Sequence, residues 1–169
     1  MIENVNGDVL ECGADIVVQQ CNAVSKKSHG LSAEIAKRLP YADLYSQRTT
    51  RRDDIGRAVL CKPPKKDASR PIVACVIAQV APGKPGDWCK PYNIDPLTDT
   101  PAKRLQMFRS GLSDLLSQLP DCEEVTTIAF PDHIGCGLAG GDWSTYLAEI
   151  KEFAQKVSPR YSIKICKKQ

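Results

Sequence analysis

The 169-residue sequence lacks the features that mark membrane, secreted and strongly nucleic-acid-binding proteins. Its longest apolar runs hold about eight residues, whereas a helix that spans a bilayer needs roughly 20. Residues 1–4 have neither a basic start nor a long apolar stretch, so we expect no secretory signal. A net charge of +3, from 23 Lys and Arg against 20 Asp and Glu, is too small to indicate nucleic-acid binding by itself. We therefore expect a soluble cytoplasmic protein, or a nuclear one if its source is eukaryotic, with no membrane partner.

Ligands for a metal are also scarce, because the chain has two histidines and eight scattered cysteines without a C-x-x-C pair. Zinc sites normally place paired ligands at such short spacings. Several cysteines, such as Cys75 and Cys166, lie in apolar runs, where a free cysteine packs as a small hydrophobic residue. We therefore expect no metal and no cofactor, and a disulfide-linked secreted scaffold is the less favoured alternative.

Strand-like and helix-like segments alternate along the chain without an internal repeat, which indicates an α/β fold in one domain over residues 1–169. Strands are expected over residues 2–5, 16–20, 58–61, 71–79, 125–130 and 161–166, and helices over 31–39, 40–45, 101–119 and 142–157. This order predicts a mixed sheet of about six strands with helices on both faces. Ligands bind beyond the carboxyl ends of the strands in such sheets, so the loops after Gln20, Gln79 and Phe130 are candidate site loops.

The strongest local motif is a glycine-rich segment between an expected strand and an expected helix. It reads Ile134-Gly135-Cys136-Gly137-Leu138-Ala139-Gly140-Gly141-Asp142-Trp143. Glycine lets backbone amides approach a ligand closely, and the N-terminus of the following helix adds partial positive charge. The spacing differs from that of a nucleotide-triphosphatase loop. The motif predicts a phosphate or pyrophosphate site, with Asp142 as the helix cap; a tight strand–helix connection is the alternative.

Four polar residues elsewhere are candidates for binding or chemistry. Asn22 can both donate and accept hydrogen bonds, which suits vicinal ribose hydroxyls. His29 lies in a polar loop before a helix and could bind phosphate or act as a base; a surface or capping histidine is the alternative. Asp8 could accept from an adenine amino group or be a turn residue. Lys84, between prolines and glycines, could contact a phosphate or be a solvated loop charge.

These motifs, taken together, resemble the macrodomains. The resemblance rests on Gly7-Asp8 after the first strand, Gln20-Cys21-Asn22 after the second, and residues 134–143 before the last helix. The final motif resembles the branch that contains ADP-ribose-1″-phosphate phosphatases and terminal ADP-ribose–protein glycohydrolases, and residues 77–86 fit a subgroup with an enlarged loop. The resemblance implies a three-layer α/β/α fold that binds ADP-ribose, or an ADP-ribosylated protein, at the C-terminal crest of the sheet.

The resemblance also implies roles for individual residues. Asp8 matches the aspartate that holds the adenine amino group, Val9 the neighbouring backbone contact, and Asn22 the asparagine near the distal ribose. The loop around the diphosphate is matched by Gly135, Cys136, Gly137 and Leu138. The other residues expected to contact the ligand are Gln20, Cys21, Gly30, Leu31, Ile134 and Ala139.

The catalytic residues of this family do not carry over. Gln79-Val80 stands where the glycohydrolase branch has its catalytic lysine, with Lys84 several residues later. Ala139 stands where that branch has its catalytic aspartate, and Asp142 is the nearest carboxylate. We therefore take His29, Lys84 and Asp142 as the candidate catalytic residues, without assuming a lysine–ADP-ribose intermediate.

The predicted function is a monomeric hydrolase that removes ADP-ribose from modified proteins or phosphate from ADP-ribose-1″-phosphate. The alternative is a reader that binds ADP-ribose without turning it over, which the loss of the catalytic pair favours. A nucleic acid such as poly(A) is a less favoured ligand. The cluster Arg48-Thr49-Thr50-Arg51-Arg52 could contact its phosphates, but such a charge run is more often a solvated face.

Overall fold

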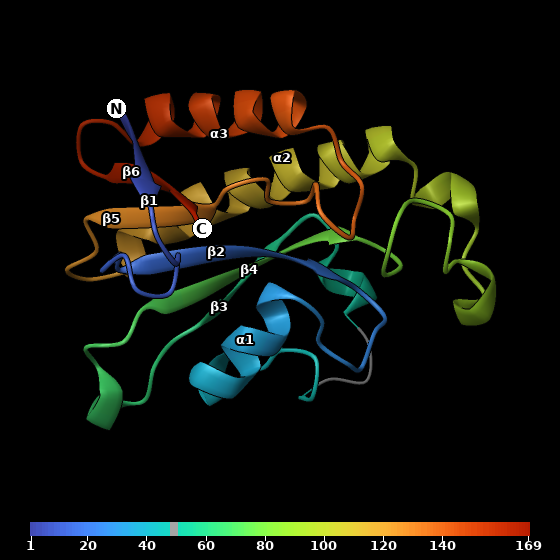
Figure 1. Cartoon of the computed structure of the whole chain (residues 1–169), viewed down its shortest axis with the longest axis horizontal. Coiled ribbons are helices and arrows are strands. Elements are labelled where there is room, and N and C mark those ends of the chain that lie inside the picture. The colour runs from blue at the N-terminus through green and yellow to red at the C-terminus, as the bar shows by residue number, and fades with distance from the viewer. Residues whose placement is uncertain (48–50) are drawn as a thin grey trace.

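The computed structural model describes residues 1–47 and 51–169, which form one six-stranded sheet with helices packed against it (Figure 1). The strands are β1 (Ile2–Asn6), β2 (Ile16–Asn22), β3 (Ala58–Cys61), β4 (Ile72–Gln79), β5 (Thr127–Pro131) and β6 (Ser162–Lys167). Their order in the sheet is β1-β6-β5-β2-β4-β3. Strand β3 is antiparallel to β4 and every other pair is parallel. Strands β2, β4 and β5 therefore end at the same edge of the sheet.

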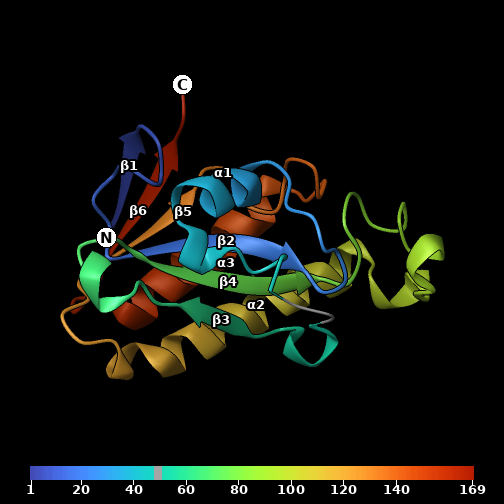
Figure 2. The same cartoon turned by 90° about the horizontal axis from the view of Figure 1, so that it is seen from below.

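Helices cover both faces of this sheet, as two perpendicular views show (Figure 1, Figure 2). Helices α2 (Pro101–Gln118) and α3 (Trp143–Val157) pack on one face, and α1 (Leu31–Arg38) packs on the other. Short 3-10 helices lie at Pro40–Ala42, Arg52–Asp54, Lys65–Asp67, Lys90–Tyr92, Pro96–Thr98 and Leu119–Asp121. The expected three-layer α/β/α arrangement with a mixed sheet is confirmed.

Strand β4 shows how the sequence produces the three layers. Its side chains alternate between the two faces of the sheet, as in any strand. Val73, Cys75 and Ile77 pack into the core beneath α1, whereas the residues between and after them pack beneath α2 and α3. All of these side chains are buried. A continuous apolar run is the pattern of a strand that is covered on both faces.

Helix α2 lies close to the sheet because of one glycine. A Cβ at Gly111 would lie 2.4 Å from Cγ1 of Val76 on β4, which is far closer than packed carbon atoms approach. The helix begins after Thr100, whose hydroxyl oxygen accepts a hydrogen bond from Lys103 N at 3.2 Å. The close approach holds the middle of α2 against β4. The first turn lies near the carboxyl end of β4, where Arg104 Nη2 donates to Ala81 O at 3.1 Å.

The structure confirms the expected strands and long helices, with ends that move by about one or two residues. The helix expected over 40–45 is wrong beyond Ala42. The chain turns at Asp43, and Tyr45 buries its ring and accepts a hydrogen bond from Asn22 N. Asp142 occupies the N-cap position of α3, but its carboxylate makes no capping bond to the backbone. Residues 48–50 of the basic cluster lie outside the described residues.

None of the described helices has the length and apolar character needed to cross a membrane. All eight cysteines are free thiols. Within residues 1–47 and 51–169, no three His, Cys, Asp or Glu side chains are grouped so that they could hold a metal ion.

Candidate functional site

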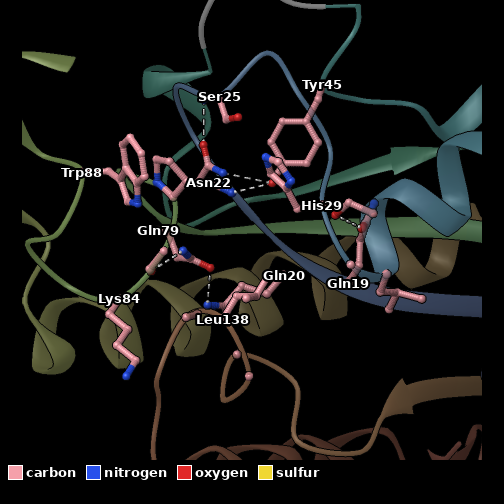
Figure 3. A pocket seen from close by; sticks show the side chains of 18 of the residues that line it. Gln19, Gln20, Asn22, Ser25, His29, Tyr45, Gln79, Lys84, Trp88 and Leu138 are labelled. Atoms are coloured by element: carbon pink, nitrogen blue, oxygen red, sulfur yellow. Dashed lines mark hydrogen bonds between the residues drawn. The ribbon is translucent and has the colours of Figure 1, made fainter. Parts of the chain in front are cut away.

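The ends of three neighbouring strands line one cleft, which has a volume of about 1350 Å³ (Figure 3). Gln20 and Asn22 come from the end of β2, and Gln79 comes from the end of β4. The glycine-rich loop after β5 contributes Ile134, Gly135, Gly137, Leu138 and Ala139. The loop before α1 and the segment after β4 also contribute to the lining.

Hydrogen bonds hold the polar side chains on the floor of this cleft. Gln20 Nε2 donates to Gln79 Oε1 at 3.0 Å, and Gln79 Nε2 donates to a main-chain carbonyl just beyond β4 at 3.1 Å. Asn22 Oδ1 accepts from Ser25 N at 2.8 Å, and Asn22 N donates to Tyr45 Oη at 2.9 Å. Because these side chains are already ordered, a ligand loses less free energy to their immobilisation when it binds.

The glycine-rich loop approaches its neighbours too closely for side chains. Gly135 has a φ of +73°, and a Cβ there would lie 2.6 Å from both Gln20 Oε1 and a ring carbon of Tyr146. Gly140 has a φ of +69°, and its Cβ would lie 3.0 Å from Cγ of Lys84. At Gly137, by contrast, no atom lies within 4 Å of the Cβ position. Gly137 therefore faces open space at the wall of the cleft.

Backbone amides of this loop are available to a ligand. Within the described part of the chain, the amides of Gly135, Gly137, Leu138 and Ala139 donate to no protein acceptor. The amide of Cys136 donates to the carbonyl oxygen of His133 at 2.9 Å, so Cys136, which the sequence placed in the loop around the diphosphate, offers no unpaired amide there. Successive unpaired N–H groups in a turn, followed by a helix N-terminus, form a concavity that favours anions.

A buried ion pair holds two walls of the cleft together. Arg104 on α2 is 2% exposed, and it donates from Nε (3.0 Å) and Nη2 (2.8 Å) to both carboxylate oxygens of Asp99, which is fully buried. Arg104 Nη1 also donates to the carbonyl oxygens of Gly83 (2.6 Å) and Ala139 (3.3 Å). The Asp99 carboxylate accepts from two main-chain amides just after β4, at 2.9 and 3.0 Å. The pair therefore joins the end of β4, the loop after it and the glycine-rich loop.

Two of the three candidate catalytic residues line the cleft. His29 and Lys84 are both exposed and lie toward opposite ends of it (Figure 3). Asp142 lines neither the cleft nor the pocket next to it; its exposed carboxylate accepts a hydrogen bond from Ser144 Oγ at 2.7 Å. The expectation that Asp142 lies beside the ligand is therefore corrected, because the loop turns this residue toward α3.

A second pocket of about 490 Å³ adjoins the cleft, and Asp8 and Val9 lie in it. The two pockets share Gly30, Leu31, Pro131, Asp132 and His133. The Asp8 carboxylate accepts from Leu10 N at 2.9 Å and from Arg38 Nη1 at 2.7 Å. Burial acts to raise the pKa of Asp8, but these two donors outweigh burial and lower the pKa below its ordinary value. Asp8 is therefore an ionised hydrogen-bond acceptor at neutral pH.

Two cysteines expected to contact a ligand lie elsewhere. Cys21 is fully buried in the core beneath α1, because neighbouring side chains of a strand point to opposite faces of the sheet. The Cys136 side chain packs against the core beneath α3 and does not line the cleft. Burial and the nearby carboxylates of Asp142 and Asp132 raise the pKa of the Cys136 thiol to about 11. This thiol is protonated at neutral pH and is not activated as a nucleophile.

Sequence reasoning missed several residues of the site. Trp88 and Tyr92 line the cleft from the irregular segment over 87–98. A segment of this length without a strand or long helix is often functional, and its length is the one sequence signal that could have found these two residues. Cys89 and Ile94 anchor this segment in a small core of its own, beside the end of β4. Tyr45 reaches the cleft through the turn after α1, for which the sequence contains no signal.

Comparisons with known proteins identify the fold. No protein-family model and no curated protein matches the chain. Among solved structures, the macrodomain of Mycobacterium tuberculosis DarG matches with a TM-score of 0.72 and 19% identity, over 98% of this chain and 97% of that one. The macrodomain of Thermus aquaticus DarG matches with a TM-score of 0.70 and 18% identity, over 98% and 97%.

A Trypanosoma brucei macrodomain solved in complex with ADP-ribose has a TM-score of 0.63 and 16% identity, over 98% of this chain and 63% of that one. The chain therefore has the macrodomain fold, as the sequence motifs predicted.

Replacing Arg104 tests whether the buried ion pair holds the cleft walls. Arg104→Met is expected to lower the free energy of unfolding by about 3–5 kcal/mol, because it leaves the Asp99 carboxylate buried without a charged partner. Urea denaturation measures this loss. Lys156→Met on α3 is the control, since both side chains of the Lys156–Glu152 pair are more than half exposed, at 55% and 59%. Equal losses in the two variants would contradict the role of the buried pair.

Proposed function

We propose that the protein binds ADP-ribose, with the adenine in the second pocket and the diphosphate and distal ribose in the cleft. One observation carries the proposal. The two pockets adjoin and share lining residues, and the cleft is lined by a loop whose backbone amides are unpaired. The cleft alone exceeds the roughly 300–1,000 Å³ of common small-molecule sites, which suits a ligand longer than a mononucleotide. A Trypanosoma brucei protein of the same fold has been solved with ADP-ribose bound, which supports the assignment.

Each part of this ligand has a chemical counterpart in the site. The ionised carboxylate of Asp8 suits the amino group of adenine, and Val9 lies beside it in the second pocket. The unpaired amides of the glycine-rich loop suit the diphosphate oxygens, because N–H groups stabilise negative charge without a charged side chain. Asn22 and Gln79, on the cleft floor, are placed to contact the hydroxyls of the distal ribose.

We further propose that the bound ligand is part of a substrate that the protein hydrolyses. In the ester reaction, water attacks C1″ of the distal ribose and the C1″–O bond to the modified side chain breaks. The side-chain carboxylate leaves with the bonding electrons, and the proton of the water passes to the His29 imidazole. In the phosphatase reaction, water attacks the phosphorus of the 1″-phosphate and the bond between phosphorus and the 1″ oxygen breaks. A proton from the water passes to the departing 1″ oxygen, and inorganic phosphate leaves. Positioning of water and substrate contributes up to ~7–11 kcal/mol to lowering such barriers.

A reader without turnover is the second candidate function, and one observation favours it. Ala139 stands in the loop where the glycohydrolase branch has a carboxylate, and Asp142 lies outside the cleft. His29 and Lys84 lie toward opposite ends of the cleft and therefore do not form a catalytic pair (Figure 3). Nucleic acid stays a weaker candidate: of the basic cluster over 48–52, Arg52 lines the cleft, and its guanidinium donates to the Tyr92 carbonyl oxygen at 3.2 Å.

Filling the space beside Gly137 tests the binding proposal. Gly137→Val is expected to weaken ADP-ribose binding at least tenfold, because the new side chain occupies the cleft next to the unpaired amides. The melting temperature should stay unchanged, since nothing lies within 4 Å of the Cβ position. Calorimetry with ADP-ribose measures the affinity. Ala148→Val, on the exposed face of α3, is the control that should bind normally. Undiminished affinity in Gly137→Val would contradict the proposed location of the diphosphate.

Turnover by alanine variants tests the hydrolase proposal. His29→Ala is expected to lower kcat about 100-fold or more, the usual contribution of a general base, while the Kd for ADP-ribose changes only a few-fold. The Lys84→Ala variant tests whether Lys84, toward the opposite end of the cleft, supplies the reactive group instead. Asp142→Ala is the control that keeps the full rate. Release of ADP-ribose from a modified protein, and of phosphate from ADP-ribose-1″-phosphate, measures the rates.

If His29→Ala and Lys84→Ala both keep the wild-type rate, the catalytic assignments fail. If the wild-type protein binds ADP-ribose but releases neither product, the reader function replaces the hydrolase.

A further inference from the structure

His133 lies where the two pockets meet. It lines both of them, as does the residue before it, Asp132. The His133 side chain is 57% exposed, so it is accessible to any ligand that extends from one pocket into the other. None of the motifs in the sequence pointed to this residue, which lies just ahead of the glycine-rich loop.

The imidazole of His133 is held in one orientation despite its exposure. Its Nδ1 lies 2.7 Å from Asp132 Oδ2, and its ring stacks on the indole of Trp143 with centroids 4.9 Å apart and planes at 19°. The backbone at His133 is left-handed, with a φ of +58°, and its carbonyl oxygen accepts from Cys136 N. Left-handed backbone is unfavourable for residues with a Cβ, and such strain concentrates at ligand sites.

The pairing with Asp132 determines what chemistry this side chain offers. In the neutral ring, Nδ1–H donates to the carboxylate and Nε2 is left as a hydrogen-bond acceptor. No described residue bonds to Nε2. The Asp132 carboxylate beside it repels phosphate oxygens, so the acceptor suits a hydroxyl group rather than the diphosphate.

We propose that His133 Nε2 accepts a hydrogen bond from a hydroxyl of the adenosine ribose and makes the protein prefer ribose over deoxyribose at this position. The proposal rests on the proposed binding of ADP-ribose, because the adenosine ribose lies beside His133 only if the ligand spans both pockets. In that ligand the adenosine ribose joins the adenine in the second pocket to the diphosphate in the cleft. Its 2′ and 3′ hydroxyls are the hydrogen-bond donors of this linking part.

Two variants with different structural defects isolate the contribution of Nε2. His133→Phe keeps a ring that can stack on Trp143 but is less suited to the left-handed backbone. His133→Asn suits that backbone but is too short to replace the imidazole, and it loses the stacking. Both remove Nε2, so an effect common to the two variants reports on Nε2 rather than on either defect.

Calorimetry measures the affinity of the wild type and of both variants for two ligands. One is ADP-ribose, and the other is an analogue whose adenosine ribose lacks both the 2′ and the 3′ hydroxyl. The wild-type protein is expected to bind ADP-ribose about three- to tenfold more tightly than the analogue, the range of one hydrogen bond. Both variants should bind the two ligands with equal affinity. If His133 had a purely structural role, the variants would bind both ligands more weakly and the ratio of the two affinities would stay unchanged.

Three results separate the possibilities. A ratio that the variants retain, or a wild-type protein that binds both ligands equally, overturns the role of His133 while ADP-ribose binding stands. A wild-type protein that binds neither ligand overturns the proposed function, and the inference on His133 falls with it. Loss of the ratio in both variants, with ADP-ribose still bound by the wild type, supports the inference.

Discussion

The cleft depends on a pair of charges that water does not reach. Arg104 and Asp99 are both buried, and three guanidinium nitrogens donate to protein acceptors on three segments of chain. Removing two charges from water is unfavourable, and their attraction offsets this only when the remaining polar atoms are also bonded. Such a pair contributes little net stability, but it positions its surroundings strongly. Neither the loop after β4 nor the glycine-rich loop can move without breaking a hydrogen bond to a buried charge.

This positioning matters because the loop offers backbone amides rather than charged side chains. An amide stabilises an anion only if its N–H points at the oxygen, so its value depends on a loop that is already ordered. Glycine at 135 allows the chain to pass against Gln20 and Tyr146, and glycine at 140 allows it to pass against Lys84. Along the same loop, four amides donate to no acceptor within the described residues. One backbone path therefore accounts both for the close packing and for the amides that the proposed diphosphate would meet.

Much of the fold could be predicted from the sequence because its signals are local. The apolar run of β4 and the periodic leucines of α2 depend only on which faces are buried, and both elements were placed within about one or two residues. Asp8, Asn22 and Gly137 were found because each directly follows a strand or lies in a glycine-rich turn. The direction of Asp142 could not be predicted, since it depends on how tightly the loop turns before α3.

Other parts of the site depend on contacts between residues that are far apart in the sequence. Arg104 reads as one more charged residue on an amphipathic helix, and only the folded chain shows that its partners come from residues 83, 99 and 139. Tyr45 likewise enters the site through a contact with Asn22 that joins distant parts of the chain. The sequence analysis placed Cys21 at the ligand because Gln20 and Asn22 beside it were placed there. Side chains alternate between the two faces of a strand, however, so the Cys21 side chain points into the core. Pairings of this kind carry no sequence pattern.

The central claim is that the unpaired amides of the glycine-rich loop after β5 hold the diphosphate of ADP-ribose. Proton–nitrogen correlation spectra of the labelled protein, recorded during titration with ADP-ribose, test this claim residue by residue. The largest shifts are expected for the amides of Gly135, Gly137, Leu138 and Ala139, with further shifts at Val9. Spectra that stay unchanged at millimolar ADP-ribose, or shifts confined to residues outside the two pockets, would contradict it.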